Sequence, residues 1–123
     1  MSKVISYKNK DVSRGGTCAF IYVSEVFTDH KDTSIALDTV PFKDKISIQV
    51  EGIFPTGSAL YFEQSNNGVL FHRILNEYGI EYSTDNECII TIPISCQYFR
   101  VILLSLSSEH KCNVKVTIYA KGM

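Results

Sequence analysis

The sequence predicts an all-β protein, an antiparallel two-sheet β-sandwich that is jelly-roll-like and has about eight strands. Short runs rich in aromatic and β-branched residues recur along the 123 residues. Turn-forming residues separate these runs at intervals of about 8–12 residues, as in sandwich folds. Two runs alternate strictly between apolar and polar side chains, which is typical of a strand with one buried face. No stretch has the apolar spacing of an amphipathic helix.

The two alternating runs are residues 45–51 and residues 112–119. Successive side chains of a strand point to opposite faces, so every second residue shares a face. The predicted inward-facing residues are Ile46, Ile48, Val50, Cys112, Val114, Val116 and Ile118.

Four further runs predict strands with less regular alternation. They cover residues 17–27, 34–40, 88–92 and 97–106. Pro41 and Pro93 end two of them, because proline has no N–H to donate to a sheet ladder. Residues 75–87 predict a loop with a short strand at 80–82.

Residues 60–74 predict a β-hairpin more clearly than any other part of the sequence. They consist of two aromatic-rich runs on either side of Ser-Asn-Asn-Gly. Asn and Gly tolerate the positive φ of a tight reversal. A four-residue loop at 65–68 places Phe62 opposite Phe71, whereas a loop of Asn-Gly alone places Phe62 opposite Arg73. We favour the four-residue loop, because it brings two large apolar side chains to one face.

Residues 1–16 are polar and end in two glycines. This composition predicts an N-terminal arm separate from a sandwich domain at residues 17–123. The arm is either a frayed end or a segment that pairs with the sheet edge of a neighbouring subunit. In the second case Val4, Ile5 and Tyr7 are the predicted partner-binding residues.

The composition excludes several functional classes. The formal net charge of −1 gives no general attraction to nucleic acid or anionic lipid. No apolar run approaches the roughly 20 residues of a membrane helix, and the first residues lack the apolar core of a signal peptide. We therefore expect synthesis in a cytoplasm, with no membrane and no nucleic-acid partner. Reduced cysteines are expected at the four positions Cys18, Cys88, Cys96 and Cys112.

The sequence offers little for catalysis. His30, His72 and His110 are far apart in the chain, and no nucleophile, metalloprotease or phosphate-loop motif is present. We expect no enzymatic activity, no cofactor and no metal. Carbohydrate binding is the stronger rival, since exposed aromatic rings stack on sugars. Tyr78 and Tyr82, in the least regular loop, are the predicted sugar contacts.

Four segments resemble a family of small β-sandwich domains in virion proteins of tailed bacteriophages. Residues 38–50 resemble its opening strand, and residues 60–68 its Glu-x-Ser-x-Asn-Gly type of hairpin. Residues 98–101 (Tyr-Phe-Arg-Val) and 114–121 resemble its later strands. Phe71 stands where the family hairpin usually has tryptophan.

The resemblance implies a non-enzymatic virion protein made in the host cytoplasm. We expect a capsid decoration or head-fibre subunit that attaches through the N-terminal arm and one outer sheet face, with a tail or baseplate attachment protein as the alternative. Family members are capsid decoration proteins, head fibres, or tail and baseplate attachments. The expected partners are capsid or other virion proteins and further copies of the chain itself, with a homotrimer favoured. A surface glycan is the alternative partner.

Overall fold

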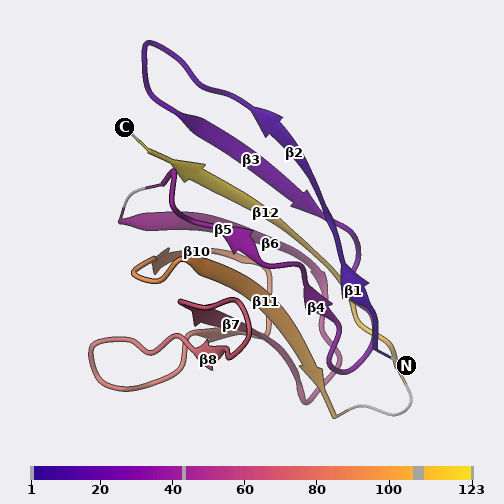
Figure 1. Ribbon diagram of the computed structural model, residues 1–123. Coiled ribbons are helices and arrows are strands. Elements are labelled where there is room, and N and C mark those ends of the chain that lie inside the picture. The colour runs from indigo at the N-terminus through magenta and orange to yellow at the C-terminus, as the bar shows by residue number, and fades with distance from the viewer. Residues whose placement is uncertain (1, 43, 107–109, 123) are drawn as a thin grey trace.

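The computed structural model describes residues 2–42, 44–106 and 110–122. These residues form two β-sheets packed face to face and contain no helix (Figure 1). The seven-stranded sheet contains β1 (Val4–Ile5), β4 (Thr33–Ser34), β5 (Leu37–Asp38), β7 (Ser58–Ser65), β8 (His72–Arg73), β9 (Ser83–Thr84) and β11 (Tyr98–Ser105). The five-stranded sheet contains β2 (Tyr7–Asp11), β3 (Ala19–Ser24), β6 (Lys45–Ile53), β10 (Cys88–Pro93) and β12 (Asn113–Lys121).

The strand order is that of a jelly roll. The five-stranded sheet runs β10-β6-β12-β3-β2, and the other sheet runs β1-β4-β11-β7-β8, with β5 on β11 and β9 on β7. From β6 to β12, the long strands β6, β7, β10, β11 and β12 alternate between the two sheets. The predicted fold class is therefore confirmed. The short pairs β4–β5 and β8–β9 each take the place of one continuous strand.

Both alternating runs are strands of the five-stranded sheet, and they pair with each other. The register sets Ile118 opposite Ile48 and Val116 opposite Val50. All seven residues predicted to face inward are buried. Opposite them, the other sheet contributes Leu60, Phe62, Phe99, Val101 and Leu103, each at most 1% exposed. Alternation identified these strands because one face of each sheet meets the core and the other meets water.

The predicted hairpin register is wrong. Gln64 pairs with His72, and the Ile74 amide donates to the Phe62 carbonyl at 2.9 Å. The loop is thus longer than either alternative, and Phe62 lies opposite Ile74. The Phe62 ring instead stacks on Phe99, with ring centroids 6.1 Å apart.

The loop is long because a side chain organises it. The Asn67 Oδ1 accepts hydrogen bonds from the amides of Val69 and Leu70, at 2.9 and 3.0 Å. These bonds extend the turn past the Asn-Gly pair, so strand pairing resumes only at His72. The short strand predicted at 80–82 is also displaced, since β9 covers Ser83–Thr84.

The N-terminal residues differ most from expectation, because they belong to the sandwich. Residues 4–5 form β1, which pairs in parallel with β4, and residues 7–11 form β2, which pairs with β3. One short segment therefore contributes a strand to each sheet. Ile5 is fully buried in the core. Polar residues 107–111, between the predicted strands at 97–106 and 112–119, predict a turn, and this turn lies partly outside the described residues.

Candidate functional site

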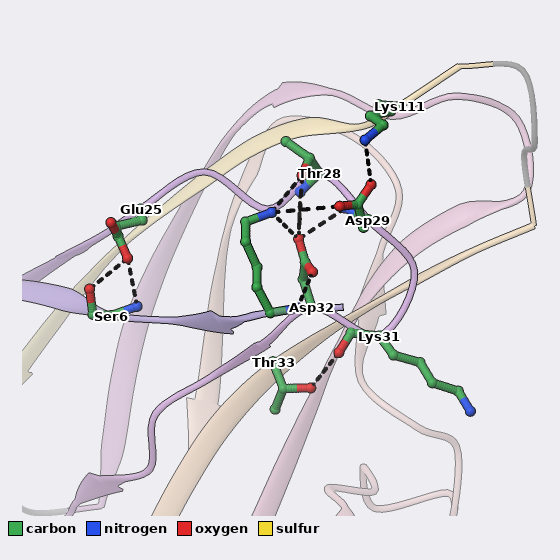
Figure 2. Close-up of polar contacts among 9 residues, drawn as sticks. Ser6, Glu25, Thr28, Asp29, Lys31, Asp32, Thr33 and Lys111 are labelled. Carbon is green, nitrogen blue, oxygen red and sulfur yellow. Dashed lines mark hydrogen bonds and ion pairs between the residues drawn. The ribbon is translucent and has the colours of Figure 1, made fainter. Parts of the chain in front are cut away.

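A buried carboxylate, that of Asp32, holds the N-terminal segment to the sandwich. It accepts a hydrogen bond from the Lys3 amide at 2.9 Å and an ion-paired hydrogen bond from the Lys3 Nζ at 2.7 Å. The amides of Thr28 and Asp29 also donate to it, both at 2.9 Å. Figure 2 shows Asp32 inside this ring of donors, with Asp29 reaching out to Lys111.

The protonation state of Asp32 follows from these contacts. Burial alone would raise the pKa of this carboxyl, but the hydrogen bonds from Asp29, Lys3 and Thr28 favour the charged form more strongly. Together they lower its pKa to about 2. The carboxylate is therefore charged at neutral pH, and its contacts with Lys3 hold the N-terminal segment against the sandwich.

A second polar contact holds the same segment. Glu25 Oε1 accepts from the Ser6 hydroxyl at 2.6 Å and from the Ser6 amide at 3.1 Å (Figure 2). These hydrogen bonds lower the pKa of Glu25. Neither Asp32 nor Lys3 stands out in the sequence, because their contact joins residues 29 positions apart and leaves no local pattern.

The three residues predicted to contact a partner lie in different environments. Ile5 is in the core, and Val4 is 69% exposed at the sheet edge. Tyr7 packs edge-on against Tyr22, its centroid 6.1 Å away, and burial raises the pKa of its hydroxyl. Ile5 and Tyr7 thus serve the protein's own sandwich. Binding of a partner at Val4 stays a prediction.

The two predicted sugar contacts are brought together. Tyr78 and Tyr82 line one open pocket of about 520 Å³, which Leu75, Asn76, Glu77 and Pro93 complete. A side chain stabilises the loop: the Asn76 Oδ1 accepts hydrogen bonds from the amides of Tyr78 and Ile80 at 2.9 and 3.0 Å. The Tyr78 side chain is 79% exposed and Tyr82 is half-buried. The pocket thus combines the exposed ring of Tyr78 with the half-buried ring of Tyr82.

An ion-pair network covers part of the outer face of the seven-stranded sheet. Glu63 accepts from Arg100 Nε at 2.7 Å and from Arg73 Nε at 3.1 Å. Each guanidinium also lies over a ring: Arg73 over Tyr61 at 4.4 Å and Arg100 over Phe71 at 3.9 Å. Phe71 therefore packs under Arg100 on the outer face of the sheet. The predicted register had instead placed it opposite Phe62, on the same face.

The described residues contain no group of three or more His, Cys, Asp or Glu that could hold a metal ion. His30 accepts from the Ser105 amide through Nδ1 at 2.9 Å, which fixes its ring. The four cysteines are all free; Cys112 is buried, and the other three are partly buried. No helix in the part of the chain that the structure describes is long and apolar enough to cross a membrane.

The fold is similar to that of a protein of phage origin. The crystal structure of the SPBc2 prophage-derived protein YomS superposes with a TM-score of 0.56, covering 89% of this chain and 99% of that one. The sequences are 13% identical, so the similarity establishes a shared fold. No protein-family model matches the chain, and neither does any curated protein.

Proposed function

We propose that this chain is a non-enzymatic structural protein of a bacteriophage virion. The supporting observation is that one jelly roll accounts for nearly the whole of both this chain and a prophage-derived protein. The sequence resemblance to phage virion sandwiches supports the same conclusion independently. Within the virion, we propose a capsid decoration or head-fibre subunit, with a tail or baseplate attachment as the alternative location.

The attachment surface we propose is the free edge of β10. The strand from Cys88 to Pro93 has no charged residue and is rich in isoleucine. The opposite edge of the same sheet, β2, carries Lys8, Lys10 and Asp11. Charges on an edge strand discourage pairing with other chains. An edge without them accepts an added strand, here an extended segment of a capsid or other virion protein.

The hydrogen-bond pattern shows which groups an added strand would meet. The Ile94 amide donates to the Asp44 carbonyl at 2.9 Å, in register with the β10–β6 pairing. Backbone groups of an antiparallel strand alternate in direction, so Ile90 and Ile92 also bond to β6. The N–H and C=O groups of Ile89 and Thr91 therefore point to the open side.

This arrangement allows a matched test at one position. Thr91→Pro removes the outward N–H while leaving the bonds to β6, and Thr91→Val keeps that N–H. Particles lacking the protein are mixed with each purified variant and sedimented through a density gradient. We expect the wild type and Thr91→Val to sediment with the particles and Thr91→Pro to remain behind, with thermal melts showing that all three fold. Equal co-sedimentation of both variants would place the contact elsewhere, and no co-sedimentation of the wild type would contradict the virion assignment.

A sugar-binding function is the second candidate, favoured by the shared pocket of Tyr78 and Tyr82. A neutral sugar ring would stack on the exposed Tyr78. Retention on a glycan array should be lost in Tyr78→Ala and kept in Val69→Ala, since Val69 is equally exposed, at 79%, and does not line this pocket. Equal retention of both variants would exclude this pocket as the sugar site.

A further inference from the structure

A second pocket, of about 570 Å³, lies on the outer face of the five-stranded sheet. Such a volume is within the usual range for small-molecule sites. Its lining residues come from the β2–β3 connection, from β3 and from the C-terminal end of β12; Figure 1 shows where these elements lie. The pocket shares no lining residue with the Tyr78 pocket.

Strand register sets which lining residues of β3 and β12 lie side by side. Ala19 lies opposite Lys121, and Ile21 lies opposite Tyr119. Ala19 is 4% exposed, Ile21 is half-buried and Tyr119 is 41% exposed. The accessible apolar surface of Ile21 thus lies beside an exposed aromatic residue.

A tight turn positions the polar end of the pocket. Arg14 and Thr17 exchange two backbone hydrogen bonds, of 3.1 and 2.8 Å, around Gly15 and Gly16. Both glycines have positive φ, 55° and 82°, as a type I′ hairpin turn requires. Thr17, two residues before Ala19, shares its face of the strand, and Arg14 lies directly across from Thr17. The guanidinium and the hydroxyl therefore join the same pocket.

The charge around this pocket is one-sided. Arg14 and Lys121 line it, and Lys10 lies across from Ile21 at its side. None of these three cations makes an ion pair with any residue that the structure describes. Asp11, the next residue of β2 after Lys10, points to the opposite face of the sheet. Its carboxylate accepts a hydrogen bond from the Ser13 amide at 2.8 Å. Two of these cations and no acid line the pocket, so its charge would attract an anion.

We propose that this pocket binds an acidic saccharide, a sugar bearing a carboxylate. The sugar ring would lie on Ile21 against the Tyr119 side chain, and the planar guanidinium of Arg14 would donate hydrogen bonds to its carboxylate. Lys121 would add charge, and the Thr17 hydroxyl would bond a sugar hydroxyl. The exposed aromatic residue beside apolar surface favours a sugar ring over an acidic peptide. This site is independent of the proposed virion attachment at β10.

The test uses the 123-residue chain and tetragalacturonate, with methyl-esterified tetragalacturonate as the uncharged control ligand. Titration by calorimetry or by amide chemical shifts should show binding of the acid that weakens with added salt, and little binding of the ester. Arg14→Gln should weaken binding about tenfold or more, as expected for the loss of a charge-assisted hydrogen bond. Tyr119→Ala should weaken it too, because the stacking surface is lost.

The control is Lys115→Gln, which removes one positive charge from the same face of β12 but outside the pocket, opposite Glu51. It should bind the acid as the wild type does. Equal weakening in Lys115→Gln and Arg14→Gln would mean general charge attraction and would overturn the proposal. So would equal binding of acid and ester, equal binding of a poly-glutamate peptide, or no binding of the acid at millimolar concentration.

Discussion

Lys3 and Asp32, 29 residues apart in the chain, are joined by two hydrogen bonds, from the Lys3 amide at 2.9 Å and from its Nζ at 2.7 Å. The partners differ in exposure: the Asp32 side chain is 0% exposed and the Lys3 side chain 46%. This difference predicts unequal effects of mutation.

Asp32→Asn should lower the free energy of unfolding by about 1.5–3 kcal/mol, the range for hydrogen bonds to a charged group. The amide would point an NH₂ group at donors that now meet a carboxylate oxygen. Lys3→Met should cost less than about 1 kcal/mol, because an exposed ammonium gains little from its ion pair and the Lys3 amide still reaches Asp32. Urea denaturation of both variants measures these two losses in the free energy of unfolding. Equal losses would show that the ion pair, and not the buried acceptor, is what matters.

The same carboxylate predicts a pH dependence. The pKa of Asp32 is lowered to about 2 in the folded protein, from about 3.9 in an unfolded chain. A lowered pKa stabilises the folded state above the unfolded value, and this contribution is lost as the pH falls through the folded value. Between pH of about 4 and about 2, the wild type should therefore lose more stability than Asp32→Asn. Parallel stability–pH curves for the two proteins would contradict the assignment.

Adjacent residues test whether the N-terminal segment belongs to the sandwich. Ile5 is fully buried, whereas Val4 is 69% exposed. Ile5→Ala should cost about 2–5 kcal/mol, as for other buried isoleucines, and Val4→Ala less than about 0.5 kcal/mol, as for a surface site. Thermal or chemical denaturation distinguishes them. A small effect of Ile5→Ala would mean that the segment detaches readily in solution.

The two hairpin phenylalanines should differ in the same way. Phe62 is fully buried and stacks on Phe99, so Phe62→Ala should cost roughly 3–5 kcal/mol. Phe71 lies half-buried beneath Arg100, and Phe71→Ala should cost clearly less. Comparable losses in denaturation would indicate that Phe71 enters the core.

The strands that sequence predicts well are those with a local signature. Residues 45–51 and 112–119 alternate by themselves, so their face and their burial could be inferred without knowing their partners. The N-terminal segment has no such signature: Ile5 is one apolar residue among polar ones. Its position depends on β4 and on Asp32, nearly thirty residues away, and composition does not reveal such contacts.

The surface sites were predicted unevenly for a similar reason. Tyr78 and Tyr82 are close in sequence, so one loop brings them together. Arg14 and Lys121 line one pocket only because β12 pairs with β3, and no local pattern specifies that pairing. The hairpin register failed because Asn67 accepts hydrogen bonds from two amides beyond the Asn-Gly pair, and this extends the loop.

The most direct test of the proposed function is cryo-electron microscopy of purified particles of the phage that encodes this chain. We expect repeated density on the particle, into which the two-sheet jelly roll fits with the β10 edge facing a neighbouring virion protein. Particles that are complete and infectious but contain no such density, with the protein recovered only from the unassembled fraction, would contradict it.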